Sequence, residues 1–425
     1  MTAIHGLTVA AALLSGDARH AKLPRFSIDE IGTSIEIPEA IPDGTGFGCA
    51  VAANDGRVAV GIDGRRDGLK HPGTVIDFHF DGLRWVPDAI LRSPESMAAD
   101  EFGSSLSIDR GRMIVGSPGA DGERGIAWCF TWSTTNGWSS PRPLRPNPIG
   151  TGDRFGDTVE ISGDLALVGI PRDDVEGMID AGRVDVFNVS PHRPTPIAGL
   201  QAEHPRTGAR FGTSLAIGQN IAVGAIGADA MGPEDEPVDR AGNVQLFSTE
   251  PPFPRVATVG RELPGPRDRS GTAVDYHART LIVGSPRARI GPDRSGVITI
   301  FGKDREEYLE PRHPDGGIGS SLVAFPPLLA FTVPGNRDES GQVDASIRIC
   351  LLRRQLFIPI LDVVGFGGAG TELILAADRR HHRLIVGAPG REEDGPYEGR
   401  AWTIDFEPIS TSPGIRSASP GRTGR

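Results

Sequence analysis

The sequence predicts an all-β fold, a seven-bladed β-propeller of four-stranded antiparallel blades whose ring is closed by a strand from the N-terminal part of the chain. A phrase of glycines and apolar residues recurs seven times, at intervals of 48 to 59 residues. Each copy holds short runs that are bounded by Gly and Pro and rich in β-branched residues, as is typical of β-strands. Repeats of this length indicate a closed propeller or an open array.

The repeated motif begins with an aromatic residue and a glycine, which start its first apolar run. Another glycine lies near the end of its second apolar run. In the second copy, Phe102-Gly103 starts the first run, and Gly116 lies 14 residues after Phe102. Thr332 replaces the second glycine in the sixth copy, and the seventh copy has about four extra residues between its first two runs. We expect the repeated phenylalanines to wedge between blades. The seven start positions are Phe47, Phe102, Phe155, Phe211, Ser270, Ile318 and Ala369.

Two further runs complete each copy. In the third run a small residue precedes a large apolar residue by five positions, as in Gly125 and Phe130, and a weaker fourth run follows, such as 256–259. The last copy ends with its third run near residue 406, whereas a lone run at 34–37 precedes the first copy. We therefore expect 34–37 to supply the outer strand of the last blade. This closure removes the open edges that a solenoid must cap.

The chain is divided into three parts by this prediction. Residues 33–406 form the propeller, and residues 1–32 form an N-terminal leader. The apolar stretch at 7–14 is similar to the hydrophobic part of a secretory signal, but no Lys or Arg precedes Arg19, so export and retention both stay open. Residues 407–425 are rich in Ser, Pro, Gly and Arg and are predicted to be a disordered tail.

Composition excludes several classes of function. The formal net charge is −11, from 44 basic and 55 acidic residues, which disfavours nucleic acid as a partner. Cys49, Cys129 and Cys350 are widely spaced, which fits small core residues better than disulfides or a metal site. No run of 18 apolar residues exists, so no transmembrane segment is expected.

The repeated phrase resembles the FG-GAP repeat family over roughly residues 33–406. Such repeats build the seven-bladed propeller of integrin alpha subunits and occur in bacterial surface proteins. The resemblance implies calcium-binding loops between first and second strands, yet the connections here, such as 53–56 and 109–111, are short and lack three carboxylates. They are typical of tight hairpin turns. The chain is closest to the calcium-free bacterial repeats, so no cofactor is expected, although calcium stays open as a ligand.

Acidic residues gather in the connections between second and third strands. In an antiparallel blade these connections lie on the same face as the connections between blades, so we expect one acidic face. Two interpretations are open: a docking face for a cation or a basic partner, and solvated loops that favour solubility. The candidate residues are Asp121, Glu123, Asp173, Asp174, Asp235, Glu236, Asp338, Glu339, Glu393 and Asp394. On the opposite face, Arg379 to Arg383 form a local basic patch that could bind an anion or be solvated.

We expect a non-catalytic binding or scaffold module that mediates protein or glycan interactions and works as a monomer. The resemblance places it at the cell envelope or outside the cell, with the cytoplasm as the alternative. The sequence contains none of the common hydrolase or zinc motifs. The alternative function is a carbohydrate-active hydrolase or lyase with its site at the central mouth of the propeller. Convergent charged residues on the innermost strands would favour that enzyme, whereas runs such as 105–108 are small and apolar.

Overall fold

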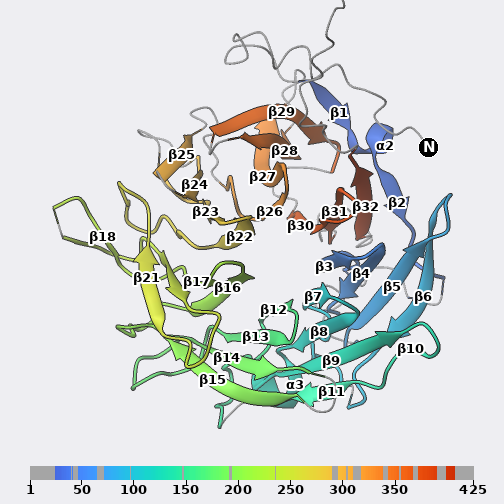
Figure 1. Ribbon diagram of the computed structural model, residues 1–425, viewed down its shortest axis with the longest axis horizontal. Helices are drawn as coiled ribbons and strands as arrows, with labels where there is room; N and C mark the ends of the chain where they lie inside the picture. The colour runs from blue at the N-terminus through green and yellow to red at the C-terminus, as the bar shows by residue number, and fades with distance from the viewer. Residues whose placement is uncertain are drawn as a thin grey trace, which may run out of the picture.

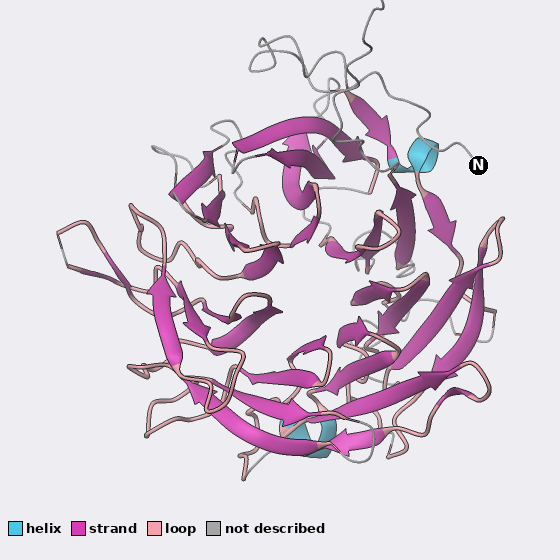
Figure 2. Ribbon diagram, viewed as in Figure 1, coloured by secondary structure: helices cyan, strands magenta, loops and turns pink. Residues whose placement is uncertain are grey.

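The computed structural model is a ring of seven β-sheets, each built on antiparallel strands (Figure 1). A channel lined by the innermost strands lies at its centre. Strands dominate the ring, and only two short helices, α2 (Ile28–Ile31) and α3 (Ala120–Glu123), occur in the part described (Figure 2). The all-β, seven-bladed prediction is therefore confirmed. The structure describes residues 24–39, 41, 46–64, 71–95, 97–145, 148–190, 194–234, 236–289, 295–302, 305–309, 317–337, 343–353, 356–366, 372–389 and 399–406.

The first four blades follow one another along the chain, each beginning at the channel and ending at the rim. In blade two the outer strand is split into two pieces that both pair with the third strand. Blade four carries an added hairpin, β18 (Ala230–Met231) and β19 (Pro237–Val238), between its second and third strands. The strands are β3 (Val51–Asn54), β4 (Arg57–Ile62), β5 (Thr74–Phe80) and β6 (Trp85–Leu91); β7 (Ser105–Asp109), β8 (Arg112–Ser117), β9 (Ile126–Ser133), β10 (Gly137–Trp138) and β11 (Arg142–Leu144); β12 (Thr158–Ser162), β13 (Leu165–Ile170), β14 (Arg183–Asn188) and β15 (Thr195–Gln201); β16 (Phe211–Ile217), β17 (Ile221–Ala225), β20 (Asn243–Phe247) and β21 (Arg255–Val259).

The last three blades include the ends of the described chain. Blades six and seven each take an outer strand from the N-terminal segment. Their strands are β22 (Ala273–His277), β23 (Thr280–Ser285), β24 (Val297–Phe301) and β25 (Arg305–Leu309); β26 (Leu322–Phe325), β27 (Leu328–Arg337), β28 (Val343–Arg353), β29 (Leu356–Val364) and β1 (Arg25–Ser27); β30 (Ile374–Asp378), β31 (Arg383–Ala388), β32 (Arg400–Asp405) and β2 (Thr33–Ile35).

Strand β2 closes the ring. It pairs antiparallel with β32, so that Ser34 lies opposite Trp402. Blade seven thereby gains its fourth strand from the beginning of the chain, as the unpaired run at 34–37 predicts. Because every blade then has a neighbour on both sides, no sheet face at the ends of the array is left open.

The N-terminal segment also contacts blade six. Strand β1 pairs in parallel with the outer strand β29, with Phe26 opposite Val363. Helix α2 follows, and Ser27 and Glu30 form a capping box at its start. Ile28 is fully buried in the core shared by blades six and seven. Residues 25–32, which the sequence assigns to the leader, thus pack on the propeller; residues 1–23 and the predicted tail 407–425 lie outside the described part.

The recurring glycines are the points where consecutive blades touch. A Cβ atom on Gly116 would lie 2.0 Å from the carbonyl oxygen of Gly156, the start glycine of blade three. One on Gly125 would lie 2.2 Å from the carbonyl oxygen of Phe155. No side chain fits at either position, because the backbone of the next blade occupies the space. The same contacts join blade seven to blade one, at Gly387 and Gly399.

The repeated phenylalanines wedge between blades as predicted. Phe155 is fully buried, and its ring meets that of Phe187 edge-on, with centroids 6.1 Å apart. Its backbone N–H bonds to the carbonyl oxygen of Arg124 in blade two. Each such residue therefore belongs to two blades, through its ring to its own and through its backbone to the previous one. Equivalent ring pairs are Phe47–Phe78, Phe102–Phe130 and Phe211–Phe247.

Blade seven differs in register from the sequence prediction. Ile374 lies opposite Gly387, whereas Thr158 lies opposite the equivalent Gly169 in blade three. By this register Glu372 is the equivalent of Gly156, two residues later than a start at Ala369 implies, and Ala369 itself lies outside the described residues. The turn at 379–382 has two more residues than the turn at 163–164, not about four. The sequence alone placed all the extra residues of this copy in the turn between its first two strands, whereas the strand pairing places only two of them there.

Candidate functional site

The central channel has two chambers, one opening on each face of the ring. We call the face with the connections between blades the connection face, and the face with the turns between first and second strands the hairpin face. The chamber at the connection face has a volume of about 590 Å³ and the one at the hairpin face about 390 Å³. Six apolar side chains from six blades line both chambers and form a collar. They are Val51, Leu106, Leu215, Val274, Leu322 and Leu375.

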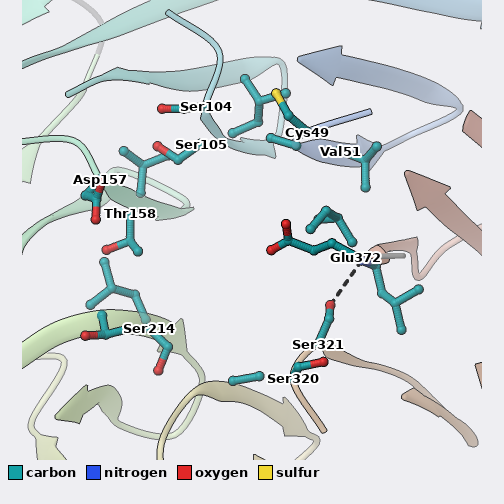
Figure 3. Close-up of a pocket in the computed structure, with 18 of the residues that line it drawn as sticks. Cys49, Val51, Ser104, Ser105, Asp157, Thr158, Ser214, Ser320, Ser321 and Glu372 are labelled. Carbon is teal, nitrogen blue, oxygen red and sulfur yellow. Dashed lines mark hydrogen bonds between the residues drawn. The ribbon is translucent and has the colours of Figure 1, made fainter. Parts of the chain in front are cut away.

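Hydroxyl groups line the chamber at the connection face (Figure 3). Three of them are occupied between blades, because Ser105, Thr158 and Ser214 each donate to the carbonyl oxygen of the next blade's start glycine, at 2.6 to 2.7 Å. Glu372 takes the place of that glycine in blade seven, and Figure 3 shows its carboxylate pointing into the chamber. These hydroxyl groups of the wall therefore join neighbouring blades, and the carboxylate of Glu372 points into the chamber.

The chamber at the hairpin face holds a cluster of charged groups. Glu160 on β12 accepts a hydrogen bond from Ser107 Oγ at 3.2 Å. Asp275 on β22 pairs with Arg379, whose Nη2 lies 2.7 and 2.9 Å from its two carboxylate oxygens. Arg379 also donates to the carbonyl oxygen of Ala324 at 2.9 Å. Groups from five blades and from distant parts of the sequence thus meet at this chamber.

The surroundings of Glu160 favour its protonated form. Its pKa is raised to about 8, mainly by burial and also by the negative charge of Asp275, while Arg379 opposes the increase. Glu160 is therefore mostly protonated at neutral pH. A carboxylic acid with a raised pKa near a second carboxylate is an arrangement that enzymes use to separate an acid from a base.

Sequence reasoning missed this cluster. Glu160 and Asp275 occupy the same position of the innermost strand, one in blade three and one in blade five, opposite Leu167 and Ile282. Aligning the innermost strands by register could have found them, since most blades carry a small or apolar residue there. The other five residues at this position are Ala52, Ser107, Ala216, Val323 and Ala376.

Three of the predicted acidic residues lie close to arginines. Asp173 is buried, and its carboxylate lies 3.5 Å from Arg183. Glu123 lies 3.6 Å from Arg154, and Asp121 lies 3.5 Å from Arg124. Arginines from the same face thus neutralise part of the negative charge that the loops carry.

The remaining candidates are divided between exposed loops and the part that is not described. Asp174 is exposed and accepts the backbone N–H of Asp180 at 3.0 Å. Glu236 is exposed and accepts the backbone N–H of Glu234 at 2.9 Å. Both carboxylates therefore order their own loops. Asp235, Asp338, Glu339, Glu393 and Asp394 lie outside the described residues.

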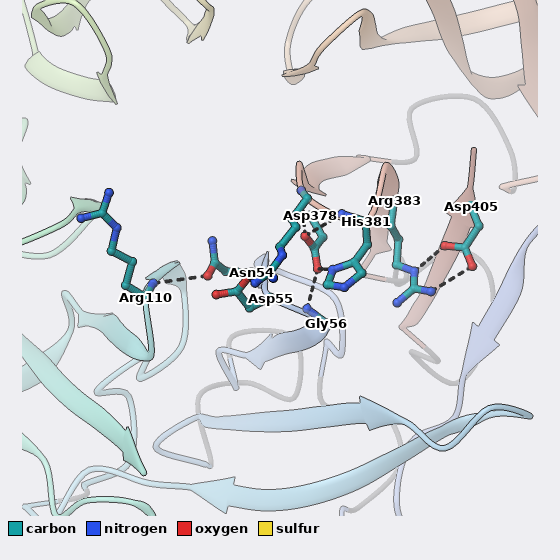
Figure 4. Close-up of polar contacts among 9 residues, drawn as sticks. Asn54, Asp55, Gly56, Arg110, Asp378, His381, Arg383 and Asp405 are labelled. Carbon is teal, nitrogen blue, oxygen red and sulfur yellow. Dashed lines mark hydrogen bonds and ion pairs between the residues drawn. The ribbon is translucent and has the colours of Figure 1, made fainter. Parts of the chain in front are cut away.

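The basic patch on the hairpin face is used in ion pairs. Arg380 contacts Asp55 of blade one at 2.7 Å, and His381 Nδ1 lies 2.8 Å from Asp378 (Figure 4). Arg383 forms an ion pair with Asp405. The sequence left anion binding and solvation open for this patch, and the structure shows a third use, the joining of blades.

The turns on the hairpin face have the geometry of tight hairpins. Asp55 and Gly56 adopt positive φ values of 50° and 81°, as do Arg110 and Gly111 in the next blade, at 47° and 70°. Among the described residues, no group of three or more His, Cys, Asp or Glu side chains is arranged to hold a metal ion. No helix in the same part of the chain is long and apolar enough to cross a membrane.

Two of the three cysteines are core residues, as expected. Cys129 and Cys350 are buried, and burial raises the pKa of Cys129 to about 11. Cys49 is partly buried at the wall of the connection-face chamber, with its Sγ 3.6 Å from the carbonyl oxygen of Gly103. The three thiols are unbridged.

Comparison with known families supports the repeat assignment. The sequence model of the FG-GAP repeat matches residues 138–187, which run from the outer strand of blade two through Phe155-Gly156 to the third strand of blade three. Together with the seven blades, this match is consistent with an integrin-alpha-like propeller. A search of curated proteins found no significant match to the chain. A propeller with an FG-GAP repeat suggests a binding or scaffold role in general.

Proposed function

We propose that this propeller is a non-catalytic docking module that binds a protein or glycan partner through its connection face. The role suits the architecture, because contacts at every seam hold the blades rigid while the connections differ in length and composition. Binding residues are frequently carried on such loops above a rigid scaffold. The proposed location is the cell envelope or the cell exterior, where FG-GAP repeats are typical, and calcium is not required.

The observation that carries the proposal is the distribution of exposed apolar side chains. Among the described residues, eight large hydrophobic side chains are exposed, and five of these lie in the connections on the connection face, one of them in the added hairpin of blade four. Four of the five belong to blades three to five. Exposed apolar side chains that gather on one face mark interaction sites. The five are Met97 (71 %), Met178 (40 %), Ile179 (62 %), Met231 (58 %) and Leu263 (65 %).

A pair of charge substitutions tests the docking face. The double variant Ile179→Asp, Leu263→Asp should fold normally, because both side chains are exposed, and should lose the partner. Leu83→Asp is the matched control, since Leu83 is 82 % exposed but lies on the hairpin face. The measurement is a pull-down from an envelope fraction and a glycan-array screen, each with calcium and with a chelator. A partner retained equally by the double variant and the control would refute the docking face.

The hairpin-face chamber favours a second function, a carbohydrate-active hydrolase or lyase. Charged groups on the innermost strands are the feature that distinguishes this alternative, and Glu160 and Asp275 supply two of them. In such an enzyme Glu160 would donate a proton to a leaving group, and Arg379 would hold the carboxylate of Asp275 in position.

Turnover of polysaccharides decides between the two functions. The wild type, Glu160→Gln and Asp275→Asn would be incubated with a panel of neutral and acidic polysaccharides, and reducing ends or unsaturated products measured. Cleavage by the wild type that Glu160→Gln abolishes would establish the enzyme. If the wild type cleaves nothing while a partner still binds the connection face, the docking role stands.

A further inference from the structure

In each blade one residue directly precedes the Phe-Gly pair or its equivalent. At the boundary between blades two and three, which we call a seam, these residues form an ion pair on the connection face. Glu101 and Arg154 occupy this position in blades two and three, both with positive φ, and form a buried ion pair. Glu123 and Asp157 also contact Arg154, at 3.6 and 3.3 Å. Each guanidinium nitrogen of Arg154 therefore lies near a carboxylate. The seam between blades two and three thus shows that residues at this position can form a buried ion pair when their charges are opposite.

At the seam between blades four and five, the same two positions carry arginine twice. Arg210 and Arg269 replace the glutamate and the arginine. Arg287 brings a third positive charge near Arg269, because its backbone N–H bonds to the carbonyl oxygen of Asp268 at 3.1 Å. Within the described residues, none of the three has a carboxylate within ion-pair distance. Asp268, next in sequence, instead accepts hydrogen bonds from Arg261 at 2.5 Å and from the N–H of Gly265 at 2.7 Å.

The electrostatic state of this cluster is unfavourable without an anion. Burial, together with the positive charges of Arg287 and Arg210, lowers the pKa of Arg269. Like charges held close together repel, and a partly buried cation without a partner loses hydration. The same position in blade two has a carboxylate, Glu101, so the fold does not exclude one here.

The backbone presents these arginines rigidly. Arg210 and Arg269 both adopt positive φ, at 54° and 57°. The hydroxyl of Thr213 donates to the carbonyl oxygen of Arg210 at 2.6 Å, and that of Thr272 to the carbonyl oxygen of Arg269 at 2.7 Å. Two equivalent turns therefore hold the two Cα atoms in fixed positions, while the guanidinium groups of Arg210 and Arg287 reach solvent.

We propose that Arg210, Arg269 and Arg287 form a binding site for a tetrahedral oxyanion, a sulfate or phosphate group. Planar guanidinium groups bind such oxygens in pairs of hydrogen bonds. The bound group supplies the negative charge that Glu101 supplies at the earlier seam. The inference deepens the docking role and depends on it only for the identity of any larger ligand, because inorganic ions test the site by themselves.

Arg210→Glu is the decisive variant. It recreates the charge arrangement of the seam between blades two and three, so it should remove anion binding without unfolding the protein. Arg124→Glu is the control, since it makes the same change of charge on a partly exposed residue of the same face. The binding of sodium sulfate and of sodium phosphate would be measured by calorimetry at constant ionic strength. We expect affinity to fall by about tenfold or more in Arg210→Glu and to stay near the wild-type value in Arg124→Glu.

A second measurement separates loss of the site from loss of the fold. Without added anion, Arg210→Glu should melt at or above the wild-type temperature, because the introduced carboxylate can pair with Arg269. With sulfate, the wild type should gain more thermal stability than Arg210→Glu. Sulfate stabilises proteins in general, so only the difference between the two proteins counts.

Two further arms identify the source of the group. Heparin, a sulfated polysaccharide, is compared with free sulfate and phosphate. Tighter binding of heparin that Arg210→Glu removes would indicate a sulfated glycan, whereas equal or weaker binding of heparin would indicate the free ion. The proposal is overturned if the wild type binds none of the three, or if Arg124→Glu weakens binding as much as Arg210→Glu. Neither result would affect the Ile179 and Leu263 test of docking.

Discussion

The carboxylate of Asp378, at the end of the innermost strand of blade seven, accepts the backbone N–H of Gly56 in blade one at 2.6 Å. The contact joins the last blade to the first on the hairpin face (Figure 4). Asp109 makes the equivalent contact with Gly163 at 2.6 Å. The boundary between blades seven and one is thus held by the same carboxylate-to-backbone hydrogen bond as the boundary between blades two and three.

Replacing Asp378 with alanine should weaken this closure. The side chain is buried, and its loss leaves the N–H of Gly56 and part of the turn at 379–382 without an acceptor. We expect the free energy of unfolding to fall by about 2 to 3 kcal/mol. Urea denaturation measures it, with Asp164→Ala as the control, because Asp164 forms an exposed ion pair with Arg112. Equal losses in the two variants would contradict the assignment.

Phe155→Ala tests the wedge between blades two and three. The ring is fully buried against Phe187, so its removal leaves a cavity. We expect a loss of about 3 to 5 kcal/mol in the free energy of unfolding. Leu83→Ala, at an 82 % exposed position, should change it by less than about 0.5 kcal/mol. A melting temperature for Phe155→Ala equal to that of the wild type would show that the ring does not hold the seam.

Gly116→Ala tests the close approach of consecutive blades. The added methyl group would lie 2.0 Å from a backbone oxygen of blade three, which cannot move without shifting that blade. A destabilisation of about 3 kcal/mol or more is expected. Gly199→Ala is the control, because the nearest atom would lie 3.6 Å away. The comparison is made by calorimetry, and similar stability of the two variants would mean that the glycine is not required for contact.

Glu160→Gln should change the pH dependence of stability. The pKa of Glu160 is raised from 4.5 to about 8, so the folded protein holds a proton that the unfolded chain releases in this range. Wild-type stability should therefore fall as the pH rises from about 4.5 to about 8. The charged groups that face it are Asp275, Arg379 and Asp109.

The glutamine variant lacks this titration. It should resemble the wild type at pH 5 and exceed it by about 1 to 3 kcal/mol at pH 9. Urea denaturation at the two values measures the difference. Glu234→Gln, in an exposed loop, should run parallel to the wild type. Parallel curves for Glu160→Gln would show that Glu160 is not held protonated.

The architecture could be predicted because each seam imposes the same steric demand. Gly116 and Gly125 recur in every regular copy because the next backbone fills the place of a side chain. Phe155 recurs because one ring must fill one gap. Such steric requirements produce residues that recur at a fixed spacing in the sequence. The closure by β2 could be predicted because the last copy has only three strand-like runs, while one lone run precedes the first copy.

The charged sites left no such trace. Glu160 and Asp275 lie in different copies, and only the strand register places them in one layer of the channel. Counting carboxylates in loops also failed to reveal that Arg154 of one blade neutralises Glu101 of another. Strand β1 was missed because three residues without a repeat partner carry no periodic signal.

The N-terminal segment has a consequence for the order of synthesis. Strands β1 and β2 leave the ribosome first, yet their partners β29 and β32 are among the last to emerge. The seam they span is the one where Thr332 replaces the recurring glycine. During translation the growing propeller is thus an open arc whose N-terminal strands stay unpaired until blades six and seven emerge. Nascent chains stalled before residue 400 should expose unpaired strand edges and depend on chaperones, whereas synthesis beyond β32 lets the arc close.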